Sequence, residues 1–125
     1  MDACSDLVVA DDPSLRLTVA EFLAMEGHAV ATASNGAEAL QVLGQDGPTI
    51  LLLDMRMPVL DGWGVACALR EQGREKPTVV MTAAQDAGRG AREIGAAGWV
   101  GKPFDLDELL AEVERVCAGA QRRPA

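Results

Sequence analysis

Five side chains with complementary chemistry follow short apolar segments of this sequence. They are Asp11, Asp12, Asp54, Thr82 and Lys102. If those segments are parallel strands of one sheet, the residues after their carboxyl ends gather along one edge, where ligands bind in α/β proteins. Three close carboxylates repel one another unless a cation joins them, and an oxygen-only ligand set suits Mg²⁺. The residue types therefore indicate a Mg²⁺ site beside an ionised aspartate that can act as a nucleophile toward a phosphoryl group.

Two kinds of apolar segment alternate along the chain, which predicts repeated βα units and an α/β fold. Residues 7–10, 29–33, 49–53, 78–82 and 99–101 are expected to be strands. Most of them are apolar at consecutive positions, as central parallel strands buried on both faces are. Segment 29–33 has alanines in place of bulky residues, so we expect it at an edge of the sheet.

Capping signals predict where the helices between these strands begin. Pro13 suits the first position of the first helix, and Gly27 suits its end. Asn35 and Asp105 each precede a glutamate by three residues, which is the spacing of a capping box. Another helix is expected over about residues 62–72.

The fourth helix has the weakest signal. Gly88 and Gly90 interrupt the segment between residues 83 and 98, where Ile94 is the only large apolar residue. Because glycine lowers helix propensity, we expect this helix to be short or mobile.

Length and composition fit one domain with an apolar core. The chain has 125 residues, of which 49% are hydrophobic, and we expect a domain over residues 1–119 with a flexible tail or the start of a linker over residues 120–125. The net charge of −8 and the 3% aromatic content argue against direct nucleic-acid binding. The longest strongly apolar run, residues 50–53, is too short to cross a bilayer. We expect a soluble, unexported, cytoplasmic protein with no membrane contact.

The cysteines and the histidine show no metal or disulfide pattern. Cys4, Cys67 and Cys117 are odd in number and have neither CxxC nor Cys/His spacing, so reduced thiols are expected. His28, the only histidine, precedes the second strand, away from the reactive strand ends, and a structural or solvated role is expected.

Four motifs occur in order at the expected strand ends. They are Asp11-Asp12, the segment DMRMPVLDG at residues 54–62, Thr82-Ala83, and the segment GAAGWVGKPF at residues 95–104. With these motifs, residues 6–119 resemble the receiver domain of two-component response regulators. The resemblance implies a flavodoxin-like, doubly wound (βα)5 fold, with five parallel strands in the order 2-1-3-4-5 and helices on both faces.

The resemblance also implies a role for each reactive residue. Asp54 would accept the phosphoryl group, Lys102 would pair with it, and the Lys102–Pro103 peptide bond would be cis. Thr82 would donate a hydrogen bond to the phosphoryl group and vacate space that Trp99 then fills, which switches the packing of the last elements. By composition, Trp99 could equally be an anchor of the core.

The same resemblance implies a set of Mg²⁺ ligands. Asp12 and Asp54 would bind the ion directly, Asp11 would bind it through water, and the backbone carbonyl of Arg56 would complete the set. Taken alone, Asp11 and Asp12 could instead cap the first helix, and Asp54 could be an ordinary turn residue.

The expected function is that of a signalling domain that catalyses its own phosphorylation and slow dephosphorylation, without an external substrate. The expected partners are a sensor histidine kinase or phosphotransfer protein and a downstream output protein or domain. We expect a monomer that phosphorylation could bring into a dimer. One alternative is a haloacid-dehalogenase-like phosphatase, although the Asp11-Asp12-Pro13 segment lacks the Asp-x-Asp motif of that family. Another is a receiver-like interaction module that works without phosphorylation.

Overall fold

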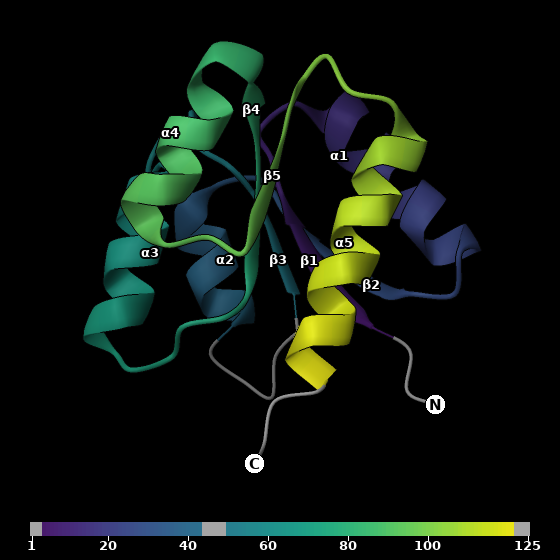
Figure 1. Ribbon diagram of the computed structural model, residues 1–125. Helices are drawn as coiled ribbons and strands as arrows, with labels where there is room; N and C mark the ends of the chain where they lie inside the picture. Colours follow the sequence, from purple (N-terminus) through teal and green to yellow (C-terminus); the bar gives the residue numbers. More distant parts are fainter. Residues whose placement is uncertain (1–3, 44–49, 122–125) are drawn as a thin grey trace.

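The five expected strands form one parallel sheet (Figure 1). The computed structural model describes residues 4–43 and 50–121, so Thr49, expected in the third strand, lies outside the described residues. The strands are β1 (Ser5–Val9), β2 (Ala29–Ala33), β3 (Ile50–Asp54), β4 (Thr78–Ala83) and β5 (Gly98–Lys102). Their order, β2-β1-β3-β4-β5, confirms the doubly wound arrangement and the edge position of the alanine-rich strand.

Helices follow the strands in the order that the capping signals predict. They are α1 (Pro13–Met25), α2 (Gly36–Val42), α3 (Gly62–Glu71), α4 (Ala84–Ile94) and α5 (Leu106–Gln121). At the start of α2, Asn35 Oδ1 accepts a hydrogen bond from the Glu38 backbone N–H at 2.9 Å, and Glu38 Oε1 accepts one from the Ser34 N–H at 2.8 Å. At the start of α5, Asp105 Oδ1 accepts from the Glu108 N–H at 2.8 Å. These contacts satisfy amide groups that the first helical turns leave free.

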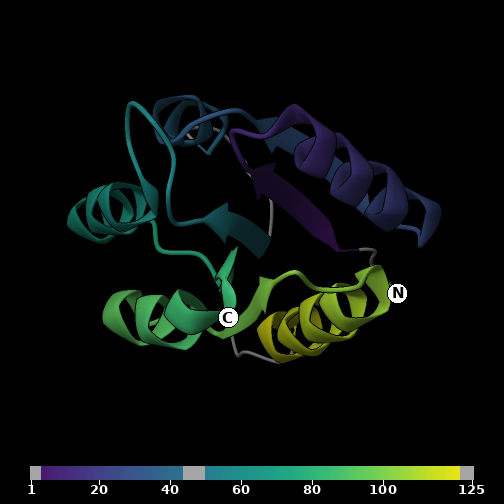
Figure 2. The same ribbon diagram turned by 90° about the horizontal axis from the view of Figure 1, so that it is seen from above.

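Two apolar layers flank the sheet, as Figure 2 shows in the view from above. One layer lies under α1 and α5, and the other lies under α2, α3 and α4. Because side chains of a strand alternate between its faces, Val8 belongs to the first layer, whereas Leu7 and Val9 belong to the second. All five residues of β3 are buried, as expected for a strand in the middle of the sheet.

The fourth helix is expected to be short or mobile, and the first of these two alternatives is wrong, because α4 has 11 residues. Its buried face consists of small residues, Ala87, Gly90 and Ala91, which let the helix pack closely without large apolar side chains. A Cβ atom at Gly90 would lie 3.5 Å from the Met55 side chain, in ordinary contact. The sequence signal was weak because this helix is stabilised by close packing and not by bulky residues.

The fifth helix runs two residues beyond Gly119, to Gln121. Residues 122–125, expected to belong to a tail or linker, lie outside the described residues. Within the described part of the chain, no helix is both long enough and apolar enough to cross a membrane.

The expectation of three reduced cysteines is also wrong. Cys4, just before β1, and Cys117, on α5, form a disulfide with a Cα–Cα distance of 6.3 Å. The two residues are 113 positions apart, so no local spacing pattern in the sequence predicts the pair. Cys67 is an exposed free cysteine on α3.

Candidate functional site

The carboxyl ends of four neighbouring strands meet at one edge of the sheet. Asp54 is the last residue of β3, and Lys102 is the last residue of β5. Thr82 lies near the end of β4, opposite Gly101 of β5. Asp11 and Asp12 follow β1, which pairs with β3. The strand order therefore brings all five predicted side chains to the same edge.

A partly buried ion pair joins Asp54 and Lys102. Lys102 Nζ lies 2.6 Å from Asp54 Oδ2, and the backbone N–H of Arg56 donates to Asp54 Oδ1 at 3.2 Å. Asp54 is 3% exposed, whereas the Lys102 side chain is 34% exposed. Both carboxylate oxygens thus have a donor, and the lysine connects this buried group to the surface. The Lys102–Pro103 peptide bond is cis.

The two acidic residues after β1 are exposed at the start of α1. Asp12 is the N-cap of this helix, and its Oδ1 accepts from the Ser14 N–H at 2.9 Å and from the Leu15 N–H at 3.4 Å. The capping role considered for this residue is therefore present. It involves Oδ1 and leaves Oδ2 available as a ligand.

Asp11 and Asp12 follow β1, and Asp54 ends β3, the strand that pairs with β1. Among the residues that the structure describes, the group of three His, Cys, Asp or Glu side chains that could hold a metal ion together is Cys4, Asp6 and His28. Asp12 is held by its contact with the start of α1, and Asp54 is held by its ion pair with Lys102. The donors at this edge are all oxygen atoms, a set that fits Mg²⁺.

Thr82 and Trp99 differ in their exposure. Thr82 is 2% exposed, and Trp99 on β5 is 49% exposed. The indole ring lies beside α4, because a Cβ atom at Gly88 would be 3.6 Å from its six-membered ring. Trp99 is therefore not an anchor of the core, and its ring stands at the surface between β5 and α4.

The loop after β3 connects the site to α4. Arg56 Nη2 lies 3.4 Å from Asp86 Oδ2, and the Arg56 guanidinium carbon is 5.9 Å from the centre of the Trp63 ring. Val59, in the same loop, has a φ of 72°, an unusual conformation for a β-branched residue. This link between Arg56 and Asp86 was not predicted, because the two residues are 30 positions apart and only the fold brings them together.

The sequence of this chain matches a known protein family. Residues 7–114 match the response regulator receiver domain. The chain belongs to this family. The match covers β1 from Leu7 onward, all of the other four strands and the reactive residues described above, and it confirms the resemblance that the four motifs indicated.

Curated relatives of this receiver domain are longer proteins. The chain is 38% identical over 118 residues to the DNA-binding transcriptional regulator NtrC of Escherichia coli, which covers 93% of this chain and 25% of NtrC. It is 38% identical over 109 residues to the response regulator MprA of Mycobacterium leprae, covering 86% of this chain and 48% of MprA. The chain thus spans between a quarter and a half of the curated relatives that it matches.

Solved structures share the fold. NtrX from Brucella abortus superposes with a TM-score of 0.86 at 29% identity, covering 96% of this chain and 28% of NtrX. The chemotaxis protein CheY4 of Vibrio cholerae superposes with a TM-score of 0.82 at 30% identity, covering 92% of this chain and 99% of CheY4. The latter is a receiver domain of similar length, and its similarity confirms the predicted flavodoxin-like fold.

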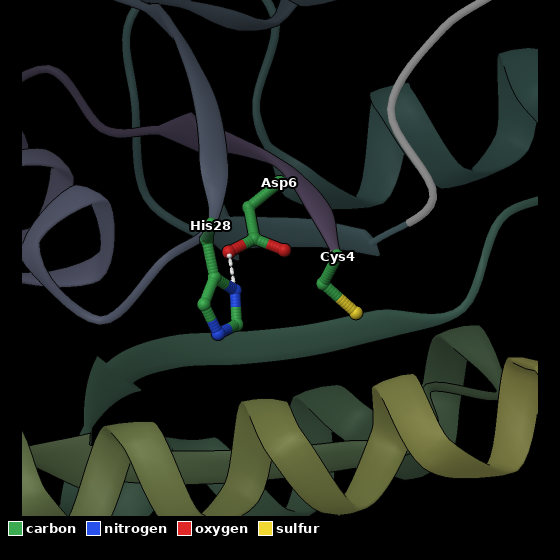
Figure 3. Close-up of side chains that lie close together, drawn as sticks. All are labelled: Cys4, Asp6 and His28. Carbon is green, nitrogen blue, oxygen red and sulfur yellow. Dashed lines mark hydrogen bonds and ion pairs between the residues drawn. The ribbon is translucent and has the colours of Figure 1, made fainter. Parts of the chain in front are cut away.

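A second polar cluster lies at the opposite edge of the sheet and was missed by sequence reasoning. His28 Nδ1 and Asp6 Oδ2 share a hydrogen bond of 2.6 Å, and Cys4 lies beside them, as Figure 3 shows. The predicted structural role of His28 is consistent with this contact. One signal was visible in the sequence, since Asp6 is a charged residue next to the apolar run of a buried strand.

Proposed function

We propose that Asp54 accepts a phosphoryl group from a phosphohistidine of a sensor kinase or a phosphotransfer protein. The observation that supports this most directly is the Asp54–Lys102 pair, a buried carboxylate with a lysine ammonium at 2.6 Å at the carboxyl edge of the sheet. The ammonium faces the carboxylate, and the ionised carboxylate is the nucleophilic form. A neutral carboxylic acid could not attack phosphorus.

The transfer follows from these contacts. A carboxylate oxygen of Asp54 attacks the phosphorus atom, the P–N bond to the donor histidine breaks, and its electron pair stays with the imidazole. The Arg56 N–H holds the orientation of the carboxylate, and Lys102 neutralises charge on the phosphoryl oxygens. Asp12, Asp54 and the Arg56 carbonyl, with Asp11 through water, would hold Mg²⁺, which would neutralise further charge on the phosphoryl group. Hydrolysis by water at the same site would return Asp54 to its free form.

The proposed conformational response involves Thr82 and Trp99. The Thr82 hydroxyl would donate to a phosphoryl oxygen, and Trp99 would move from the surface toward the space that Thr82 leaves. The junction that would carry this change is tightly packed, because a Cβ atom at Gly101 would lie only 2.6 Å from Ala84 Cα at the start of α4. A shift at the end of β4 or β5 would therefore displace α4.

Membership of the family supports a proposal for the location and partners of this domain. We propose a cytoplasmic location and an output protein or domain that reads the face formed by α4, β5 and α5. A DNA-binding output is one form, because the relative NtrC is a DNA-binding transcriptional regulator. We propose a monomer that can associate through this face after phosphorylation. The dehalogenase-like phosphatase has no support in these comparisons.

The decisive experiment is intact mass spectrometry after incubation with Mg²⁺ and acetyl phosphate. The wild type should gain one labile phosphoryl group, and Asp54→Asn or a chelator should prevent the gain. Asp6→Asn is a matched control, because it neutralises the other buried aspartate at the opposite edge and should still be phosphorylated. A folded wild type without an adduct, under acetyl phosphate and under a phosphohistidine donor, would favour the phosphorylation-independent interaction module.

Tryptophan fluorescence tests the proposed switch separately. The chain has two tryptophans, so Trp63→Phe leaves Trp99 as the only one. Phosphorylation of this variant should shift Trp99 emission to shorter wavelength, because its ring would leave the solvent. An unchanged spectrum in fully phosphorylated protein would show that Trp99 stays at the surface.

A further inference from the structure

The amino ends of β1 and β2 hold a polar cluster within the apolar layer under α1 and α5. Cys4 and His28 immediately precede these two strands, and the backbone N–H of Ala29 donates to the Cys4 carbonyl at 3.0 Å. Asp6 is on the same side of β1 as Val8, whose neighbours in this layer include helix residues of α1 and α5. The cluster is thus at the edge of the sheet opposite the phosphorylation site.

Asp6 has an unsatisfied oxygen in this setting. Its side chain is fully buried, and Oδ1 has no hydrogen-bond partner, whereas Oδ2 bonds to His28. In Figure 3 the free oxygen points toward the Cys4 side of the cluster. Burial raises the pKa of Asp6, and the nearby His28 lowers it only in part. A buried acceptor without a donor is costly, and a cation placed beside it would remove that cost.

The residues around this oxygen offer one sulfur, one nitrogen and one oxygen ligand. The ligand atoms of Cys4, Asp6 and His28 all lie within 4.8 Å of one another. Such a mixed set is typical of Zn²⁺ and related borderline metals, whereas Mg²⁺ prefers oxygen atoms. In tetrahedral zinc sites, bonds of about 2.0–2.3 Å place ligand atoms roughly 3.3–3.7 Å apart, so small movements would suffice.

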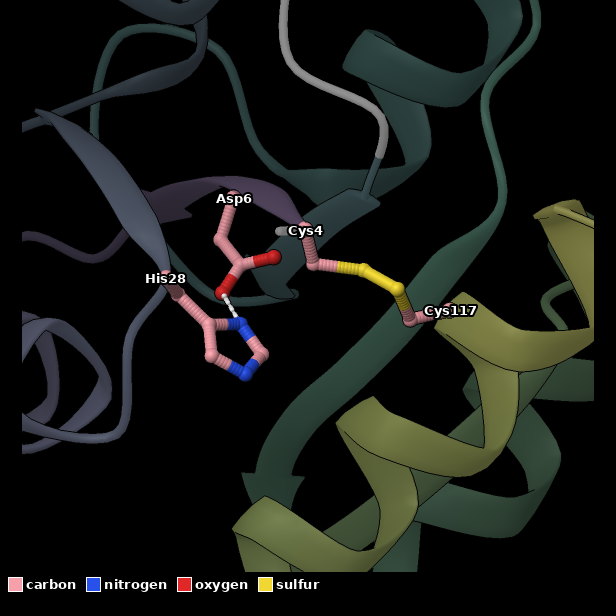
Figure 4. The surroundings of a disulfide bond; sticks show 4 residues. All are labelled: Cys4, Asp6, His28 and Cys117. Atoms are coloured by element: carbon pink, nitrogen blue, oxygen red, sulfur yellow. Dashed lines mark hydrogen bonds and ion pairs between the residues drawn. A yellow bond between two sulfur atoms is a disulfide. The ribbon is translucent and has the colours of Figure 1, made fainter. Parts of the chain in front are cut away.

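We propose that Cys4, Asp6 and His28 form a Zn²⁺ site that is available only when the Cys4–Cys117 disulfide is reduced. A disulfide sulfur is not a thiolate, so the oxidised form lacks the sulfur ligand. Figure 4 shows Cys117 of α5 bonded to Cys4 beside the Asp6–His28 pair. The bound ion would replace the hydrogen atom that now joins His28 Nδ1 to Asp6 Oδ2. Cys117 is therefore the residue that closes the site.

A phosphine would open the site by reducing the Cys4–Cys117 disulfide. The S–S bond takes up two electrons, the phosphine becomes its oxide with the oxygen of one water molecule, and the two protons of that water yield two thiols. The Cys4 thiol then loses its proton when the metal binds. Because Cys117 lies on α5, reduction would also release the covalent link between this helix and β1.

The first test compares two redox states of the same chain, so no variant has to fold. Zn²⁺ affinity is measured by competition with a chromophoric chelator, before and after reduction with a phosphine and its removal without oxygen. Reduced protein should bind one Zn²⁺ at least about a hundredfold more tightly than oxidised protein. Co²⁺ in place of Zn²⁺ should give a thiolate charge-transfer band in reduced protein only. Equal affinities in the two states would overturn the proposal.

Variants then assign the ligands, all of them in a Cys67→Ser background, because Cys67 is exposed and could bind metal or pair between molecules. Cys117→Ser should bind Zn²⁺ without any reductant, since Cys4 is then always a thiol. Cys4→Ser should not bind in either state. Asp6→Asn and His28→Gln should each weaken binding at least tenfold, with folding checked by circular dichroism and by phosphorylation of Asp54. Binding retained by Cys4→Ser, or absent from a folded Cys117→Ser, would refute the assignment.

Discussion

Two buried aspartates at opposite edges of one sheet have different surroundings. Asp54 at the carboxyl edge is paired with Lys102, and its second oxygen accepts the Arg56 N–H. Asp6 at the amino edge is paired with His28 at the same distance of 2.6 Å, but its second oxygen has no partner. The Lys102 side chain is 34% exposed, whereas the His28 side chain is 7% exposed.

The difference shows how the same residue type is adapted to different chemistry. Asp54 has the Lys102 ammonium and the Arg56 backbone N–H beside it. Lys102 is partly exposed, so a phosphate donor can approach the pair from the solvent. Asp6 lies in an apolar layer beside nitrogen and sulfur, closed by a disulfide. A carboxylate whose oxygens are both satisfied and whose lysine partner reaches the solvent suits group transfer, whereas a carboxylate enclosed with an unsatisfied oxygen suits a structural role or a bound metal.

Of the contacts at the two edges, the disulfide at the amino edge should have the largest effect on the free energy of unfolding. Reducing the link between Cys4 and Cys117 should lower the free energy of unfolding by about 4 kcal/mol, because a crosslink over more than a hundred residues strongly restricts the unfolded chain. Urea denaturation with a phosphine and a metal chelator measures this loss. Cys67→Ser, which leaves the disulfide intact, should show the same loss on reduction. A change below about 1 kcal/mol would mean that packing alone holds the amino edge.

Breaking each ion pair compares the two edges directly. His28→Ala should lower the free energy of unfolding by about 3 kcal/mol, because it leaves the buried Asp6 carboxylate without a partner. Lys102→Ala should cost only about 1 kcal/mol, since Asp54 keeps the Arg56 N–H and water can replace the half-exposed lysine. Equilibrium urea unfolding at neutral pH measures both values. Equal losses would remove the distinction between the edges.

Magnesium should distinguish the two aspartates with a smaller effect. At a Mg²⁺ concentration of about ten times its dissociation constant, the wild type should gain about 1.4 kcal/mol of stability, because only the folded chain assembles the site. Asp54→Asn should lose this gain, and Asp6→Asn should keep it. Thermal unfolding with and without Mg²⁺ provides the measurement. A gain that survives Asp54→Asn would place the ion elsewhere.

The pH dependence of stability should show opposite signs for two acidic groups. Burial raises the pKa of Asp6 above its ordinary 3.8, so the folded chain keeps this proton longer than the unfolded chain does. The Asp6 contribution to stability should therefore fall as pH rises from 3.8 through the raised pKa. Arg115 lowers the pKa of Glu112 below 4.5, so the contribution of Glu112 is complete above 4.5 and is lost as pH falls through the lowered pKa.

Urea unfolding of Asp6→Asn and Glu112→Gln beside the wild type, over about pH 3.5 to 7, tests these signs. The Glu112 effect should stay below about 1 kcal/mol, because the ion pair with Arg115 is close to solvent. Parallel slopes for the two variants would contradict the assignment of Asp6 as the more strongly desolvated group.

Much of this protein could be predicted from the sequence, because the signals are local. The alternation of apolar segments indicated the βα units, and the residues after each strand indicated the site. Asn35 and Asp105 marked helix starts through contacts within four residues. In a parallel sheet, equivalent strand ends must meet, so Asp54, Thr82 and Lys102 could be placed together without coordinates.

Only the tertiary structure decided the contacts between distant segments. Cys4 and Cys117 are 113 residues apart, and Asp6 and His28 are 22 apart, so neither pair leaves a spacing pattern in the sequence. The length of α4 also depended on the fold, because its alanine and glycine face gains its stability by close approach to the sheet. Helix and strand propensities and the residue types at strand ends can be read from local sequence. Burial and the pairing of distant residues depend on which surfaces pack together, and only the folded molecule decides that.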